Sequence, residues 1–287
     1  MTQKVSIYIP TRNRRALLER AIASVRQQTY DNIEIVVVND GSNDDTWDYL
    51  RDLASRERRL VCLHTEMPRG PSAARNRALA AASGHFVTGL DDDDEFRADR
   101  IALFLSRWTS LGSGADLISC LFSESVLTDG VISKVTTDRK DHVSYFDLFR
   151  HNFIGNQVFC PRERLLAIGG YDETMPAWED LEMFMRLVER YGDARRLPEP
   201  TYTYYVERAR ERISTNAERQ YRAFRKIVDK TADVPAEFHH RLFLELFSPF
   251  YGTVPTLADW KTMLAWRARP QLLARLLRAS VRNSLRA

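Results

Sequence analysis

The feature that most constrains the fold is the alternation of short apolar runs with amphipathic segments over the first 120 residues. The run Ile35-Val36-Val37-Val38 is apolar at every position, which is typical of a strand in a parallel sheet that helices cover on both faces. The pattern predicts strands at 5–9, 33–39, 60–64 and 85–90, and helices around 17–25, 44–54, 72–82 and 98–111. It therefore predicts an α/β fold with a doubly wound, mainly parallel sheet.

A different pattern begins after Asp116, where strands and helices no longer alternate regularly. It predicts strands at 117–122, 126–135 and 201–206, a turn at Asp129-Gly130, and helices at 145–150, 161–168 and 179–191. The rest of the chain is expected to be helical. We therefore divide the chain into a domain at 1–210, with a doubly wound half at 1–115 and an α+β half at 116–210, and a helical extension at 211–287.

The composition excludes several classes of protein. A chain of 287 residues with 44% hydrophobic and 28% charged residues is typical of a folded globular protein. The net charge of +3 is too small to indicate a nucleic-acid-binding protein. The three cysteines form no C-x-x-C pair, which argues against disulfides and thiolate metal sites. Neither a signal peptide nor a run of about 18 apolar residues is present, so a cytoplasmic location is expected.

Polar and acidic residues follow three of the predicted strands, at 10–13, 39–42 and 91–94. Ligands of a doubly wound sheet bind at the carboxyl ends of its strands, so these residues are candidates for a site. The four adjacent aspartates at 91–94 repel one another unless a cation neutralises them, and their hard oxygen atoms favour Mg²⁺ or Mn²⁺. A solvated acidic loop is the alternative. Because no P-loop and no G-x-G-x-x-G follows the first strand, the expected ligand is a metal-chelated diphosphate.

Five stretches of the chain together resemble one known family. They are VSIYIPTRN at 5–13, EIVVVNDGS at 34–42, ARN at 74–76, LDDDD at 90–94, and GGYDE at 169–173 followed by Trp178-Glu179-Asp180. Their order and spacing over residues 3–206 resemble the family 2 inverting glycosyltransferases of the GT-A fold. The resemblance implies metal-dependent transfer of one sugar from a nucleotide diphosphate sugar, a UDP-sugar by preference. The implied acceptor is a glycan or a polyprenyl-diphosphate-linked glycan in cell-surface polysaccharide biosynthesis.

The resemblance also implies a role for each matching residue. The donor is expected to bind at Pro10, Thr11, Arg12, Asn13, Asp40, Arg75, Asp91 and Asp92, with Asp40 on the nucleotide base. Asp91 and Asp93 are expected to hold Mn²⁺ or Mg²⁺ against the diphosphate. Asp180 is expected to be the general base that inversion requires, and Glu179 and Trp178 are expected to bind the acceptor. Taken singly, Asp40 also fits a turn, Arg75 a solvated surface, and the Glu179-Asp180 pair a helix N-terminus.

Three other functions share part of this pattern. A processive polysaccharide synthase would add Q-x-x-R-W and membrane-spanning helices, but the Arg107-Trp108 pair has Phe104 where glutamine is needed. A sugar-nucleotide pyrophosphorylase would need a glycine-rich loop after the first strand. A non-catalytic module that binds a nucleotide sugar or docks on a membrane remains an alternative, although the intact acidic motifs favour an enzyme.

The C-terminal segment combines apolar and basic residues. Seven cations stand against the single anion Asp259 between 255 and 287: Lys261, Arg267, Arg269, Arg275, Arg278, Arg282 and Arg286. The apolar residues at helical spacing are Leu257, Trp260, Leu264, Leu272, Leu273, Leu276, Leu277 and Val281. Such a segment can lie on an anionic membrane surface, which would make the enzyme peripheral at the cytoplasmic face. Packing of these residues on the catalytic domain or in a homodimer is the alternative.

Overall fold

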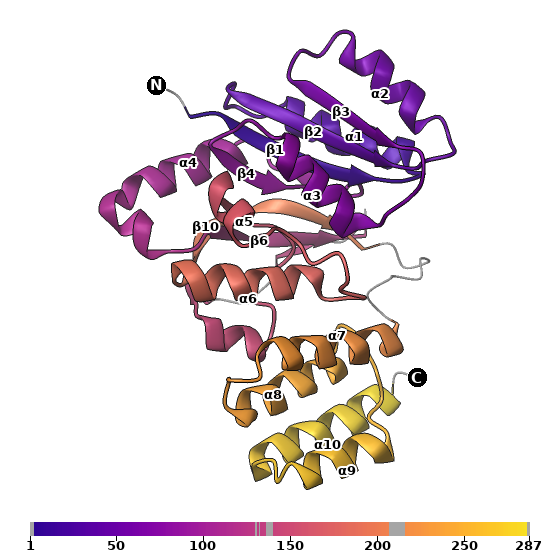
Figure 1. The fold of residues 1–287 in the computed structure, drawn as a ribbon, viewed down its shortest axis with the longest axis vertical. Helices are drawn as coiled ribbons and strands as arrows, with labels where there is room; N and C mark the ends of the chain where they lie inside the picture. Colours follow the sequence, from indigo (N-terminus) through magenta and orange to yellow (C-terminus); the bar gives the residue numbers. More distant parts are fainter. Residues whose placement is uncertain (1–2, 130, 132, 136–139, 207–215, 286–287) are drawn as a thin grey trace.

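The chain folds around one mixed sheet with helices on both faces and a helical extension at one end (Figure 1). The computed structural model describes residues 3–129, 131, 133–135, 140–206 and 216–285. Its first elements are β1 (Val5–Thr11), α1 (Arg15–Arg26), β2 (Ile33–Asp40), α2 (Thr46–Ala54), β3 (Leu60–Thr65), α3 (Pro71–Ala81), β4 (Phe86–Gly89), β5 (Glu95–Phe96) and α4 (Arg100–Ser110).

The second half and the extension follow in chain order. The second half contains η1 (Gly112–Leu117), β6 (Leu121–Thr128), β7 (Ser133–Val135), β8 (His142–Val143), η2 (Tyr145–Phe149), β9 (Phe159–Pro161), α5 (Arg162–Ala167), α6 (Glu179–Tyr191) and β10 (Ala194–Tyr205). The extension contains α7 (Ala217–Lys230), α8 (Ala236–Phe243), η4 (Leu244–Phe247), α9 (Leu257–Ala265) and α10 (Pro270–Ser284).

The strand order separates a parallel region from a mixed one. The order is β3-β2-β1-β4-β9-β6-β10-β5, with β7 beside β6 and β8 beside β10. The first four strands of this order are mutually parallel, whereas β9 runs antiparallel to both β4 and β6. The predicted doubly wound half and the predicted α+β edge are therefore both present.

Alternate residues of the central strands face two different hydrophobic cores. In β2, Val36 and Val38 lie in the core that also contains buried residues of α3 and α6. Ile35 and Val37 lie in the core that contains buried residues of α1, α2 and α4. Every residue of β2 is buried, which explains why its sequence is apolar without alternation.

Two strands of the second half differ from the prediction. β10 begins at Ala194 rather than near 201, because Pro198 and Pro200 interrupt its apolar pattern. Its register with β6 also shifts between Leu197 and Tyr202. β9 is missing from the prediction, since a strand of three residues leaves no periodic signal.

Other boundaries of elements also differ from the predicted ones. The strand predicted from 117 begins at Leu121 instead, after η1 and a short link. β6 and β7 pair antiparallel, as the turn at Asp129-Gly130 implies, although Gly130 itself lies outside the described residues. The predicted boundary at 210 also lies outside the described residues.

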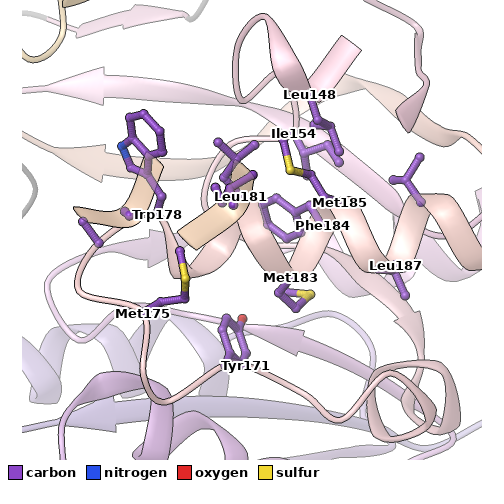
Figure 2. Packing of buried hydrophobic residues seen from close by; sticks show 14 of the residues in the cluster. Leu148, Ile154, Tyr171, Met175, Trp178, Leu181, Met183, Phe184, Met185 and Leu187 are labelled. Atoms are coloured by element: carbon purple, nitrogen blue, oxygen red, sulfur yellow. The ribbon is translucent and has the colours of Figure 1, made fainter. Parts of the chain in front are cut away.

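α6 anchors the second half on the sheet. Leu181, Phe184 and Met185 lie on one face of the helix, and Figure 2 shows them packed with Leu148 and Ile154. Acidic residues occupy the first turn, where they interact favourably with the positive end of the helix dipole. The residues that begin α6 are therefore held by a well-packed helix.

The helical extension packs on the second half. Phe224, Phe243 and Leu276 are buried in the same core as the apolar face of α6. Figure 1 shows α9 and α10 at the end of the molecule farthest from β1, β2 and β3. Within the described ranges, no helix combines the length and the apolar character needed to cross a membrane.

Candidate active site

The carboxyl ends of β1, β2 and β4 meet at one edge of the sheet, where Asp40 ends β2. Asp40 Oδ1 accepts hydrogen bonds from the backbone N–H of Arg69 at 2.8 Å and from the hydroxyl of Thr65 at 3.2 Å. Its Oδ2 accepts the backbone N–H of Gly70 at 2.8 Å. Asp40 therefore fixes the loop before α3, and its place at the strand end keeps it among the donor candidates.

The loops that follow β1 and β2 are joined to each other. Asn13 has a left-handed φ of 54°. Its backbone N–H donates to Ser42 Oγ at 2.8 Å, and its Oδ1 accepts the backbone N–H of Asn43 at 2.8 Å. Asn13 therefore holds the two loops together. The remaining candidates in this segment are half-buried Pro10, buried Thr11 and exposed Arg12.

The four aspartates after β4 alternate between buried and partly exposed positions. Asp92 and Asp94 are 4% and 1% exposed, whereas the side chains of Asp91 and Asp93 are 23% and 34% exposed. Asp94 accepts the hydroxyl of Tyr202 at 2.7 Å and a backbone N–H of β10 at 3.0 Å. The alternation leaves Asp91 and Asp93 accessible to a ligand and ties Asp94 to the sheet.

Arg14, which the sequence pattern did not single out, neutralises part of this run. Its Nη1 lies 2.8 Å from Asp92 Oδ1 and 3.0 Å from Asp93 Oδ2. Burial raises the pKa of Asp92 to about 6, and the charge of Arg14 opposes that rise. The cation that the aspartates require is therefore supplied in part by the protein itself. In the sequence, only its position directly after the Thr-Arg-Asn motif could have indicated that Arg14 belongs to the site.

Arg75 of α3 joins the two acidic clusters of the site. Its side chain is 7% exposed, with Nη2 2.9 Å from Asp91 Oδ1 and Nη1 3.3 Å from Glu179 Oε1. The guanidinium carbon lies 5.3 Å from the ring centroid of Tyr171. This burial excludes a solvated surface role, and one cation connects the carboxyl end of β4 to the start of α6.

Asp180 lies beside this ion pair at the start of α6. Its Oδ1 is buried and has no hydrogen-bond partner within the described part of the chain. Burial raises the pKa of Asp180 well above its usual value; Arg75 opposes the rise, and the carboxylates of Glu179 and Asp91 add to it. Such a carboxylate can accept a proton near neutral pH. Trp178, buried and with a left-handed φ of 59°, directly precedes this acidic pair.

The loop that leads to α6 is fastened to α3 by one side chain. Asn76 Nδ2 donates to the carbonyl of Tyr171 at 2.8 Å, and its Oδ1 accepts the N–H of Tyr171 at 2.8 Å. Gly170 has a φ of 67°, and a Cβ at this position would lie 2.4 Å from Asn76 Oδ1. The Ala-Arg-Asn and Gly-Gly-Tyr stretches therefore interlock in space.

Gln157 is a second residue of the site that the sequence did not reveal. Its Nε2 donates to Asp91 Oδ1 at 3.3 Å, and its Oε1 accepts the hydroxyl of Tyr8 at 3.3 Å. A Cβ at Gly89 would lie 1.8 Å from Gln157 Oε1, so the glycine leaves room for this contact. Gln157 and Arg75 together orient Asp91. A lone glutamine 66 residues from its partner leaves no pattern in a sequence.

Two lysines of α7 hold the same loop from the helical extension. Lys226 Nζ donates to the carbonyl of Thr174 at 2.8 Å. Lys230 Nζ lies 2.5 Å from Asp172 Oδ2 and 2.6 Å from Glu182 Oε1. The extension therefore helps to position the segment that leads into α6.

The acidic run fits a divalent ion that the substrate helps to bind. Within the described ranges, no three His, Cys, Asp or Glu side chains are grouped so as to hold a metal ion. The partly exposed carboxylates of Asp91 and Asp93 can supply one or two ligands. Mg²⁺ is commonly bound by one or two carboxylates together with substrate phosphates. These residues would therefore hold Mn²⁺ or Mg²⁺ together with a diphosphate.

Known proteins are similar to this chain in sequence. The model of the family described as Glycosyl transferase family 2 matches residues 6–165. WcaA of Escherichia coli (strain K12), whose name refers to glycosyl transfer in colanic acid biosynthesis, is 30% identical over 235 residues, 79% of this chain and 82% of that protein. The GalNAc(5)-diNAcBac-PP-undecaprenol beta-1,3-glucosyltransferase of Campylobacter jejuni is 38% identical over 171 residues, 59% of this chain and 55% of that protein.

Solved structures share the fold. S. aureus TarS 1–349 in complex with UDP-GlcNAc gives a TM-score of 0.69 at 18% identity, over 96% of this chain and 79% of that chain. The mannosyltransferase PcManGT from Pyrobaculum calidifontis, in complex with GDP-Man and Mn²⁺, gives 0.63 at 18% identity, over 99% of this chain and 87% of that chain. At these identities the likeness concerns the fold alone, and it confirms the predicted GT-A-like architecture.

Proposed function

Because this chain belongs to glycosyl transferase family 2, we propose that it moves one sugar, with inversion, from a UDP-sugar to a hydroxyl group of a lipid-linked glycan. The observation that supports this most is the contact of Arg75 with both Asp91 and Glu179. That contact brings the predicted donor motif and the predicted acceptor motif to one place. A module that only binds nucleotides would not need the second motif beside the first.

The donor is expected to bind at the carboxyl ends of β1, β2 and β4. The base would lie near Asp40 and Arg12, and the diphosphate near Asp91 and Asp93. When bound, a divalent ion supplies positive charge that stabilises the diphosphate as it leaves. The fold accommodates donors of this class, since the solved neighbours named above hold UDP-GlcNAc and GDP-Man.

The acceptor hydroxyl is expected to approach from the side of Asp180. Its oxygen forms the new bond to the anomeric carbon while the bond from that carbon to the diphosphate oxygen breaks. Asp180 is expected to take the hydroxyl proton, since its buried Oδ1 accepts no hydrogen bond from the residues that the structure describes. Glu179 and Trp178 would border the acceptor, since they directly precede the base.

The acceptor class is proposed from the named relatives. The Campylobacter protein is named for an acceptor on undecaprenyl diphosphate, and the Escherichia protein for colanic acid biosynthesis. A glycan on polyprenyl diphosphate, extended at the cytoplasmic face of a membrane for cell-surface polysaccharide, is therefore the proposed acceptor here.

The first test measures binding and turnover of a panel of sugar nucleotides with and without Mn²⁺. We expect Asp93→Ala to lower donor affinity at least ~10-fold with Mn²⁺ present. The variant removes a carboxylate that would hold the ion, and the charge of the ion offsets that of the diphosphate. EDTA should have the same effect on the unaltered protein. Asp116→Ala, at an exposed position of η1, is the matched control.

Two outcomes would contradict the proposal in different ways. If EDTA-treated protein transfers sugar at the untreated rate, metal dependence is wrong. If no sugar nucleotide in the panel is bound or turned over under any condition, the transferase assignment itself fails.

A further inference from the structure

α10 carries two apolar stripes on different faces. The inner stripe is Leu272, Leu276 and Ala279, which are 8%, 0% and 7% exposed and belong to the main core. The outer stripe is Leu277, Val281 and Leu285, which are 56%, 56% and 83% exposed. Spacing of four residues places the outer stripe along one side of the helix. Since the inner stripe already anchors α10, the outer stripe is available for a partner.

The helical pair α9 and α10 presents only positive charge to solvent. Arg278 is exposed beside the outer stripe, and Lys261 and Arg267 are exposed on and after α9. Arg282 is half-buried and donates to the carbonyl of Phe247 at 2.5 Å, so its guanidinium is turned toward the protein. The single anion of residues 255–285 is Asp259, which is 5% exposed and caps the N-terminus of α9. The partner of this surface therefore carries negative charge beside an apolar layer.

The inner face of α10 connects this surface to the active site. Asn283 Nδ2 donates to the carbonyl of Phe247 at 3.3 Å and to that of Thr253 at 2.6 Å. Tyr251, between these two residues, has its ring centroid 6.1 Å from that of Trp178. The buried face of α10 is therefore linked, through the segment that contains Tyr251, to the residue that precedes α6.

We propose that the outer stripe docks in the interfacial layer of an anionic lipid bilayer. Leu277, Val281 and Leu285 enter between the headgroups, and the exposed Arg278 contacts lipid phosphates. This inference rests on the proposed function for its purpose, because a polyprenyl-linked acceptor is embedded in such a bilayer. An antiparallel symmetric contact between two copies would instead set the arginines of each chain beside those of the other.

The test is co-sedimentation of the full chain with vesicles. Vesicles of phosphatidylglycerol and phosphatidylcholine should bind the protein, and pure phosphatidylcholine vesicles or high salt should weaken binding. The double variant Leu277→Glu/Val281→Glu should reduce the bound fraction at least ~fivefold, since it places negative charge on the outer stripe that would enter the bilayer and repels anionic lipid. Leu117→Glu, at a position 76% exposed on η1, is the matched control and should bind as the unaltered protein does.

The remaining measurements separate the competing explanations. Thermal unfolding of the double variant should match that of the unaltered protein, because both positions are exposed. Undiminished vesicle binding by the double variant overturns the proposal. The proposal is also overturned if the unaltered protein is a dimer that binds no vesicles and the double variant is a monomer. In that case the outer stripe is a subunit interface. Vesicle binding without sugar transfer to a water-soluble acceptor analogue supports docking and contradicts the proposed function.

Discussion

The two acidic clusters of the site, at 91–94 and 179–180, carry charge of the same sign but differ in how the protein compensates it. In the first cluster Arg75 pairs with Asp91, Arg14 pairs with Asp92, and both oxygens of Asp94 accept hydrogen bonds. In the second cluster, Oδ1 of Asp180 has no partner among the residues that the structure describes. Arginines and hydrogen-bond donors therefore hold the carboxylates of the first cluster, whereas the second has a buried oxygen to which no described residue donates.

The comparison shows that a raised pKa alone does not identify a general base. Burial raises the pKa of Asp94 as well as that of Asp180. Both oxygens of Asp94 nevertheless accept hydrogen bonds from β10, one from the hydroxyl of Tyr202 and one from a backbone N–H, which tie this carboxylate to the sheet. Asp180 differs in that no described residue donates to its Oδ1, which is why we propose it, and not Asp94, as the general base.

The largest expected effect is that of Asp180→Asn, which keeps the shape of the side chain and removes the proposed proton acceptor. Transfer should fall at least ~10²-fold, since general bases commonly contribute 10²–10⁴-fold. Donor affinity, measured by calorimetry, should stay within about twofold because the donor motifs are unchanged. Glu173→Gln, at a side chain 41% exposed in the preceding loop, is the control.

Asp94→Asn makes the comparison sharper. It should lower the temperature of thermal unfolding, because it weakens the hydrogen bonds to a buried carboxylate. If Asp94→Asn lowers transfer as much as Asp180→Asn does and leaves stability unchanged, Asp94 has more than the structural role described here.

Arg75→Gln should have the next largest effect, because it removes the cation shared by both clusters. Arg75 lowers the pKa of Asp180, so its loss should raise that pKa further and move the acid limb of the pH–rate profile to higher pH. Stability should also fall by about 3–5 kcal/mol, as expected when a buried ion pair loses one member. Arg77→Gln on the same helix is the control, and an unmoved acid limb at measurable activity would contradict the coupling.

Lys230→Met should have the smallest effect, because it loosens the loop before α6 without touching either cluster. The ammonium group holds Asp172 and Glu182, and Glu182 keeps a second partner in Arg186. We expect about threefold slower transfer with unchanged donor affinity, since a small displacement of the base lowers the rate. Lys134→Met, at an exposed position of β7, should leave the rate unchanged.

Much of the fold could be predicted because periodicity reports burial. The all-apolar run at 35–38 indicates a strand covered on both faces, and α6 follows from apolar residues one turn apart. The first part of β10 could not be predicted in the same way. This part of β10 is held by pairing with β6, which is far away in the chain and therefore invisible to local periodicity. Pro198 and Pro200 also fall within the strand, and in a local pattern prolines indicate that a strand is interrupted.

The site was predictable only where its residues stand in motifs. The stretches that contain Asp91, Arg75 and Asp180 converge as the resemblance implies, although the role of each remains a prediction. Arg14 and Gln157 were missed because their partners are 78 and 66 residues away in the chain. The charge of the four aspartates does not by itself require a metal ion, because Arg14 and Arg75 from other elements compensate part of it.

The double hydrogen bond between Asn76 and Tyr171 limits how this chain can be recombined with its relatives. A hybrid protein that takes residues 1–115 from one relative and the rest from another would take Asn76 and Tyr171 from different proteins. The amide at 76 would then meet a foreign backbone, and any side chain larger than hydrogen at position 170 would collide with it. Donor preference should therefore be transferable between relatives by grafting donor-site loops while Asn76 and Tyr171 stay together. Exchange of whole halves should give a protein that is not active.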